Sequence, residues 1–209
     1  MKLQIAEGAF LLSGFATQSA ATLAAAIQDV IARAPLRHMT VPGGHTMSVA
    51  MTNCGKAGWV SDRTGYRYAV IDPGTGLPWP PMPECFIDVA TRAAAYAGYE
   101  KFVPDVCLIN RYQPGARMSL HQDKDERDFT APIVSVSLGA AATFLFGGLA
   151  RSDKMIRVPL AHGDVVVWGG PARLAYHGIA PLKSGEERFN LTLRLAFDKA
   201  PWARHSYQN

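Results

Sequence analysis

Two stretches in the first hundred residues place their apolar positions at helical spacing. In the first stretch one face collects Leu23, Ile27, Val30 and Ile31. Thr17-Gln18-Ser19 offers capping side chains before this stretch, and Pro35 ends it. A second helical pattern opens at Pro83 and closes at Gly98. The pattern therefore predicts two helices in the N-terminal half.

From about residue 105 onward the apolar positions form short runs separated by Gly, Pro and Asp turns. The strands predicted there are 106–112, 133–138, 143–146, 155–160, 165–168 and 189–197. Many short strands at this spacing are typical of a sandwich or barrel, and the absence of alternating helices argues against a doubly wound parallel sheet. We expect an α+β, mainly β fold: a double-stranded β-helix (jelly roll) with supporting N-terminal helices.

Between the two predicted helices the pattern is irregular. Strands are expected at 9–13, at 47–51 and near 66–71, and Gly and Pro punctuate residues 53–85. Long loops without regular structure are usually functional. We therefore expect one domain over 1–209, in which about 40–85 covers the substrate and about 105–197 forms the jelly-roll core.

Composition and charge narrow the class without deciding the function. The 209 residues are 48% hydrophobic and 18% charged, as in an ordinary folded protein. A net charge of +4 permits a nucleic-acid partner but does not require one. The three cysteines are widely separated, which indicates free thiols in a reducing compartment. With no signal peptide and no membrane-length apolar run, we expect a cytoplasmic protein.

The first candidate chemistry is His121-Gln122-Asp123. Residues two apart in a strand share a face, so this imidazole and carboxylate would converge, and His177 lies far enough on to return to the same point. Two histidines and one carboxylate form the facial set of non-haem Fe(II) oxygenases. A rival motif, 162–164, contains a central glycine just before an apolar strand, and there we favour a capped turn. The alternative for 123–126 is a solvated charged turn.

A second feature is the polar face of 188–194, which carries Arg188, Asn190, Thr192 and Arg194. Such a face is costly to bury unless an anion compensates the charge, and guanidinium groups bind carboxylates bidentately. Asn110 and Tyr112 alternate on an earlier strand and could add donors to the same anion. The alternatives are a polar face that is simply wet and a tyrosine hydroxyl that satisfies a buried asparagine.

With these residues in this order, the chain resembles the Fe(II)- and 2-oxoglutarate-dependent dioxygenases, and among them the AlkB-type oxidative nucleic-acid demethylases. The likeness runs from about residue 39 to 197. Its strongest pieces are 42–44, 47–55, 108–112, 119–125 and 188–194.

The resemblance implies a cofactor set and its ligands. His121, Asp123 and His177 would bind Fe(II) and form the catalytic centre at which O2 reacts. The co-substrate 2-oxoglutarate would be held by a set of polar residues, with the last nearer its metal-chelating end: Asn110, Tyr112, Asn190, Arg188 and Arg194.

The resemblance also implies a substrate. The residues expected to bind it are Met51, Trp59, Tyr66, Asp125 and Arg151. Trp59 and the imidazole of His177 would stack on the damaged base, Asp125 would face its polar edge and Arg151 would lie at the rim. The expected reaction is demethylation of N1-methyladenine and N3-methylcytosine, which releases formaldehyde, succinate and CO2. The expected partner is alkylated single-stranded DNA, with double-stranded DNA and RNA as further candidates, for a monomeric enzyme.

Two other functions fit the same residues. One is a 2-oxoglutarate-dependent hydroxylase of a small molecule or a protein side chain. The other is non-enzymatic: a basic, β-rich nucleic-acid-binding module, against which the complete metal set and the arginine strand argue.

Overall fold

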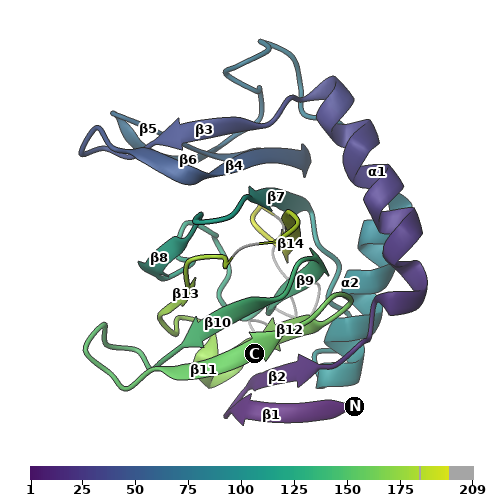
Figure 1. Ribbon diagram of the computed structural model, residues 1–209. Coiled ribbons are helices and arrows are strands. Elements are labelled where there is room, and N and C mark those ends of the chain that lie inside the picture. Colours follow the sequence, from purple (N-terminus) through teal and green to yellow (C-terminus); the bar gives the residue numbers. More distant parts are fainter. Residues whose placement is uncertain (184, 198–209) are drawn as a thin grey trace, which may run out of the picture.

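The computed structural model describes residues 1–183 and 185–197, and it folds as two facing antiparallel sheets with two helices on one side (Figure 1). The large sheet has the order β1-β2-β12-β9-β14-β7-β4-β3. Its strands are β1 (Lys2–Ala6), β2 (Ala9–Leu12), β12 (Val165–Trp168), β9 (Ile133–Gly139), β14 (Arg188–Arg194), β7 (Val106–Tyr112), β4 (Thr46–Gly55) and β3 (Arg37–Thr40).

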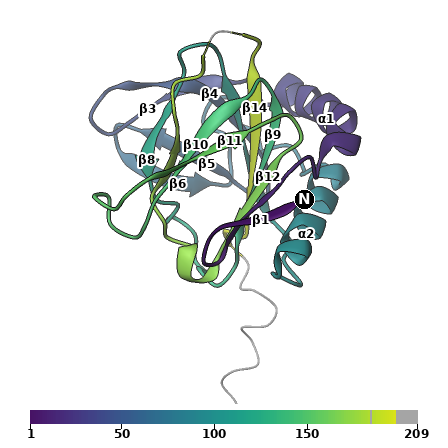
Figure 2. The ribbon, with the colours of Figure 1, turned by 60° about the horizontal axis from the view of Figure 1, so that its bottom comes forward.

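The small sheet has the order β11-β10-β13-β8. Its strands are β11 (Ile156–Leu160), β10 (Ala142–Phe146), β13 (His177–Ile179) and β8 (Met118–His121). Apolar residues of both sheets, among them Ile133, Phe144 and Trp168, form the core cluster between them. This mainly β, two-sheet arrangement confirms the predicted jelly roll (Figure 2).

The helices α1 (Ala20–Arg33) and α2 (Glu84–Ala97) cover the outer face of the large sheet and bury a second core cluster there. Gly98 ends α2 with φ 101°, a left-handed conformation that suits glycine. The predicted cap of α1 is wrong: Ser19 makes no side-chain cap hydrogen bond, because a 3₁₀ turn over Thr17–Ser19 leads into the helix instead.

Two further corrections concern strands. The strand predicted over 189–197 begins at Arg188 and ends at Arg194, since the backbone N–H groups of Ala196 and Phe197 donate to the Asp105 carboxylate rather than to a neighbouring strand. Among the described residues, four strands were not expected from the sequence pattern: β1, β3, β5 and β13. The strand expected around His121 is β8, which has only four residues, and β13 has only three, too few for an alternation to be visible.

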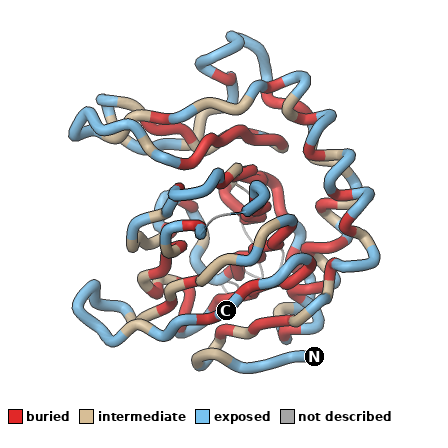
Figure 3. The backbone as a smooth tube through the Cα atoms, in the orientation of Figure 1, coloured by how far each residue is buried: buried red, intermediate tan, exposed pale blue. Residues whose placement is uncertain are grey.

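The region between the helices is more ordered than its glycine and proline content indicates. β4 is an integral strand of the large sheet, and buried residues run along it (Figure 3). The hairpin of β5 (Gly58–Asp62) and β6 (Gly65–Ala69) forms a separate sheet beside it. The loop after the hairpin is tied by buried Asp72, which accepts hydrogen bonds from Arg37, Gly74 and Thr75. Within the described ranges, no helix is long and apolar enough to cross a membrane.

Candidate active site

Two histidines of the small sheet face each other across neighbouring strands. His121 ends β8, His177 begins β13, and the two are direct partners in the antiparallel register. Their ring centroids lie 4.4 Å apart. Nδ1 of His121 lies 2.8 Å from the Ser119 carbonyl, and Nδ1 of His177 lies 3.0 Å from the Ala175 carbonyl. Because a carbonyl only accepts, each Nδ1 carries the proton, which leaves both Nε2 atoms free to bind a metal.

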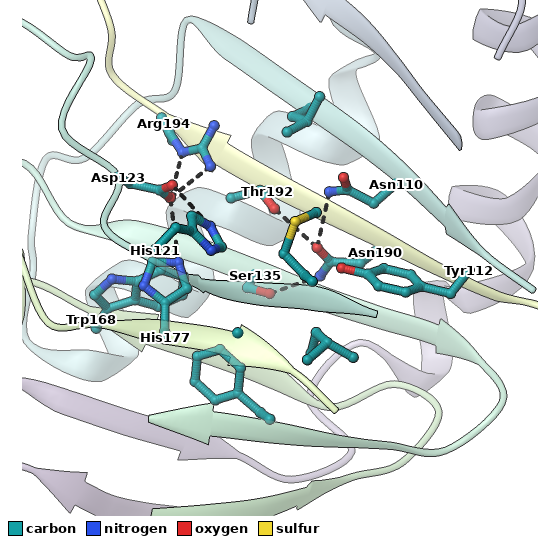
Figure 4. Close-up of a pocket in the computed structure, with 15 residues that line it drawn as sticks. Asn110, Tyr112, His121, Asp123, Ser135, Trp168, His177, Asn190, Thr192 and Arg194 are labelled. Carbon is teal, nitrogen blue, oxygen red and sulfur yellow. Dashed lines mark hydrogen bonds and ion pairs between the residues drawn. The ribbon is translucent and has the colours of Figure 1, made fainter. Parts of the chain in front are cut away.

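Asp123 completes the set from a loop rather than from a strand. The expectation that His121 and Asp123 share a strand face is wrong, since β8 ends at His121. Arg194 places the carboxylate instead, and donates to Oδ2 from Nε at 2.9 Å and from Nη2 at 2.6 Å (Figure 4). Asp123 Oδ1 lies 3.5 Å from His121 Nε2, and Oδ2 lies 3.8 Å from His177 Nε2. Ligand atoms of the three residues all lie within 4.8 Å of one another.

Electrostatics keep two of the three residues, Asp123 and His177, in the protonation state that a metal needs. Burial would raise the pKa of Asp123, but the charge of Arg194 and the neighbouring imidazoles of His121 and His177 together outweigh it and hold the pKa well below its usual range. Burial, and then the neighbouring His121, lower the pKa of His177 to about 4. Burial also disfavours charge on His121, but the hydrogen bond and charge of Asp123 prevail and raise its pKa. The carboxylate is thus ionised, and His177 is neutral, over the physiological range.

The two imidazoles differ in exposure, and this corrects one expectation. The side chain of His177 is only 6% exposed, because its ring packs 4.9 Å from that of Trp168 and 6.0 Å from that of Phe144. The side chain of His121 is 37% exposed. The imidazole available to stack on a base is therefore that of His121, and the wall role expected for His177 is wrong.

A polar pocket extends from the metal residues between the sheets (Figure 4). The predicted face of β14 lines it, in register with β7: Asn190 lies opposite Asn110, and Arg188 lies opposite Tyr112. Asn190 is fixed by its donation to Ser135 Oγ at 2.7 Å, and Thr192 donates to Asn190 Oδ1 at 3.0 Å. The pocket's remaining wall is apolar and consists of Leu108, Met118, Phe144, Trp168 and Ile179.

Arg188 packs on Tyr112, which lines this pocket, and its surroundings suit an anion. Its guanidinium is wholly buried over the Tyr112 ring, at 4.9 Å from the centroid. Nη2 donates to Ser137 Oγ at 3.0 Å, whereas Nε and Nη1 have no hydrogen-bond partner among the described residues. Burial lowers the pKa of Arg188. Buried charges are normally paired, so this one fits the distal carboxylate of 2-oxoglutarate, just as the His121–Asp123–His177 set fits Fe(II).

The hairpin brings three of the expected substrate residues together. The Trp59 and Tyr66 rings stack at 5.6 Å and 14°. Trp59 Nε1 donates to Asp125 Oδ2 at 2.7 Å, which joins the hairpin to the segment that carries Asp123. Arg151 lies in the β10–β11 turn, 5.9 Å from the Tyr176 ring centroid. Met51 is wholly buried in the core between the sheets. None of the five expected residues lines the pocket described above, and contacts join only Trp59, Tyr66 and Asp125.

The rival motif is a turn, as expected. Asp164 accepts from the backbone N–H of Ala161 at 2.8 Å and from that of Gly14 at 2.7 Å. His162 Nδ1 accepts from the Gly139 N–H at 2.9 Å. These residues cap backbone groups and take no part in the metal set.

Comparisons with known proteins agree with this geometry. The family model described as "2OG-Fe(II) oxygenase superfamily" matches residues 8–194. The chain is 57% identical, over 93% of each chain, to the "Alpha-ketoglutarate-dependent dioxygenase AlkB" of Escherichia coli K12. The chain belongs to the AlkB-type 2OG-Fe(II) oxygenases. It is an iron- and 2-oxoglutarate-dependent dioxygenase, and the His-Asp-His set fits the iron that this family uses.

More distant relatives extend the likeness of this AlkB-type oxygenase. It is 46% identical to an "Alpha-ketoglutarate-dependent dioxygenase AlkB homolog" of Caulobacter vibrioides, over 78% of this chain and 76% of that one. Among solved structures, "The structure of OsALKBH1" superposes with a TM-score of 0.81 at 27% identity, and covers 93% of this chain and 100% of that chain.

Sequence reasoning missed several residues of this AlkB-type site. Ser135 and Ser137 alternate with valines on β9 and face the same pocket as β14, so their two-residue period was a usable signal. Glu126, Arg173 and Tyr68 form a buried polar network beside Asp123 and come from distant parts of the chain. No local pattern indicates such a network.

Proposed function

We propose that this dioxygenase repairs alkylated nucleic acid, and that N1-methyladenine and N3-methylcytosine in single-stranded DNA are its substrates. Double-stranded DNA and RNA are further candidate substrates, and we propose that the enzyme acts as a monomer. We also propose a division into a substrate cover at about 40–85 and a catalytic core at about 105–197. Two relatives support nucleic acid as the substrate class. They are named "DNA N(6)-methyladenine demethylase ALKBH1A" in Arabidopsis thaliana and "tRNA demethylase abh1" in Schizosaccharomyces pombe.

The site contains residues that suit both Fe(II) and 2-oxoglutarate. His121, Asp123 and His177 would hold Fe(II) through two Nε2 atoms and one carboxylate oxygen. Arg188 would bind the distal carboxylate of 2-oxoglutarate through Nε and Nη1, and Asn110 and Tyr112 would line its path to the metal. Iron and 2-oxoglutarate together supply an oxidant from O2, with release of succinate and CO2.

The protein residues then decide what is oxidised. The ring of Trp59 and the exposed imidazole of His121 provide surfaces on which a flipped base can stack. Asp125 accepts from Trp59 at Oδ2, which leaves its Oδ1 to interact with the guest. A methyl on N1 of adenine or N3 of cytosine makes the base cationic, which suits aromatic surfaces and a carboxylate. Hydroxylation of that methyl gives a hemiaminal, which releases formaldehyde and the repaired base.

One observation supports the proposed substrate more than any other: the Trp59–Tyr66 stack is joined through Asp125 to the segment that carries His121 and Asp123. An aromatic platform with a carboxylate two residues from a metal ligand suits a flat, cationic guest. A small aliphatic substrate would gain little from it.

The test is an incubation with Fe(II), 2-oxoglutarate and a single-stranded oligonucleotide that carries one defined methylated base. We expect formaldehyde and succinate in equal amounts and loss of 14 mass units from the oligonucleotide, a CH2 difference that fixes the reaction as demethylation. An intact oligonucleotide beside active 2-oxoglutarate turnover would refute the substrate. If a small molecule or a peptide stimulated that turnover, the hydroxylase alternative would replace it. If His121→Ala retained full activity on bases, the metal assignment would be wrong.

A further inference from the structure

A closed ring of charged residues surrounds the carboxylate ligand. Arg194 donates two hydrogen bonds to Asp123 Oδ2, and its Nε also lies 3.5 Å from Glu126 Oε1. Arg173 donates to Glu126 Oε2 at 3.0 Å and to the backbone carbonyl of Asp123 at 2.7 Å. Both carboxylates and both guanidinium groups are buried. Two positive and two negative charges therefore balance. The Glu126 carboxylate contacts both arginines, whereas Asp123 is held by Arg194 at its carboxylate and by Arg173 at its backbone carbonyl.

The β5–β6 hairpin contacts this ring of charged residues through Tyr68. The Tyr68 hydroxyl donates to Glu126 Oε1 at 2.6 Å, and lies 3.5 Å from Arg194 Nη1. Burial raises the pKa of Tyr68 well above its usual value, so the hydroxyl keeps its proton. Tyr68 is the direct cross-strand partner of Trp59 in the hairpin. Two opposite residues of the hairpin thus donate to two consecutive carboxylates, Trp59 to Asp125 and Tyr68 to Glu126.

We infer that Tyr68 and Glu126 are positioning residues of the metal centre, which act on Asp123 through Arg194. The hairpin therefore contributes to metal binding through Tyr68, as well as to base recognition through Trp59 and Asp125. The inference rests on the metal site proposed above, but it does not depend on which substrate is oxidised.

The physical reason is competition for one guanidinium. Arg194 already lies nearer to Asp123, at 2.6 Å, than to Glu126, at 3.5 Å. If Glu126 no longer shared its charge, Arg194 would attract Asp123 more strongly and could draw the carboxylate away from the two imidazoles. The Tyr68 hydroxyl fixes Glu126 Oε1 at the point where it shares the Arg194 charge. Groups that orient a metal ligand in this way influence affinity although they do not touch the metal.

The experiment compares Mn(II) affinity by calorimetry in the full-length protein, without substrate. The variants are Tyr68→Phe, Glu126→Gln and the double variant, and Tyr96→Phe is the control. Tyr96 is an exposed tyrosine of α2 outside the site, so this control removes one hydroxyl without a change near the metal residues. We expect Tyr68→Phe to weaken Mn(II) binding about 10-fold, at the low end of effects for groups around metal ligands, and Tyr96→Phe to bind within about twofold of the parent.

The double variant tests the route. If Tyr68 acts through Glu126, Tyr68→Phe should have no further effect in the Glu126→Gln background. The visible spectrum of the Co(II) form gives an independent reading, and it should change in Glu126→Gln as the ligand geometry relaxes. Parent-like affinity in a folded Tyr68→Phe protein, or an equal loss in both backgrounds, would overturn the inference. If Tyr68→Phe failed to fold, an unaltered Co(II) spectrum in Glu126→Gln would overturn it instead.

These outcomes are separate from those of the proposed function. Metal affinity is measured without nucleic acid, so a protein that binds Mn(II) as expected but leaves methylated bases intact would refute only the substrate. Loss of Mn(II) binding in His121→Ala verifies that the measured site is the intended one.

Discussion

Replacement of Arg188 by methionine should weaken the binding of 2-oxoglutarate without lowering the stability of the ligand-free protein. Arg188 is wholly buried, and its Nε and Nη1 have no hydrogen-bond partner among the described residues. A carboxylate that accepts from both atoms forms two charge-assisted hydrogen bonds, each worth about 1.5–3 kcal/mol. Their loss amounts to about 3–6 kcal/mol, and at about 1.4 kcal/mol per tenfold we expect 2-oxoglutarate affinity to fall by at least 10²-fold.

The same change should not destabilise the protein without its ligand. Methionine retains most of the apolar stem and removes a buried charge whose desolvation costs several kcal/mol, whereas the lost bond to Ser137 and the stacking on Tyr112 contribute about 1–2 kcal/mol each. We therefore expect the ligand-free variant to melt no lower than the parent. The parent should gain stability when 2-oxoglutarate and Mn(II) are added, and the variant should not.

Calorimetric titration of 2-oxoglutarate into the Mn(II) form, with thermal melts of the ligand-free protein, measures both effects. Arg157→Met is the control, because Arg157 is an exposed residue of β11. The two charge-assisted bonds expected here should be lost in Arg188→Met. If this variant bound 2-oxoglutarate within about threefold of the parent, the unpaired guanidinium atoms would not face the carboxylate. A melting temperature lowered by several degrees would show that Arg188 is chiefly structural.

Three further predictions follow from the site. Asp125→Asn should change the preference between methylated adenine and methylated cytosine in competition assays more than it changes Mn(II) affinity; equal loss of both would mean that Asp125 helps to hold the metal. Metal affinity should fall with acidification, because protonated imidazole does not bind metal. As pH falls, His121, whose pKa is raised, should account for the first proton, and His177 should add a second only near pH 4. Proton release per Mn(II), measured by calorimetry in two buffers, would contradict this if it reached two at pH 6. Asp164→Ala should lower the free energy of unfolding by about 1–3 kcal/mol through loss of two backbone caps while Mn(II) affinity stays unchanged, and a loss of metal binding there would revive the rival motif.

The parts of the site that a short period reveals could be predicted from the sequence. The alternation in 188–194 placed Arg188, Asn190 and Arg194 on one face, and the register with β7 carries that face into the pocket. The metal residues were predicted as a set, but their geometry was not. β8 and β13 are too short to show a period, and Asp123 is placed by Arg194, 71 residues away.

The difference in exposure between His121 and His177 could not be predicted from their neighbours in the sequence either. His177 is buried because Trp168 and Phe144, on other strands, pack against it. The network of Tyr68 and Glu126 has the same origin, since a hairpin residue and a loop carboxylate meet only after the two parts of the chain have folded together. Such contacts depend on tertiary structure, which no window along the chain samples.

The direct pairing of His121 with His177 makes the metal geometry a property of strand register rather than of chain length. Whatever lies between the two histidines can grow or shrink while the register of β8 and β13 is kept. The β10–β11 turn is exposed over residues 149–154 and carries Arg151, whose guanidinium lies 5.9 Å from the ring centroid of Tyr176, the residue before His177. Insertions or grafted loops at that turn would reshape the entrance while the catalytic centre stays fixed. The scaffold is thus suited to laboratory evolution of new substrate ranges on an unchanged oxidising core.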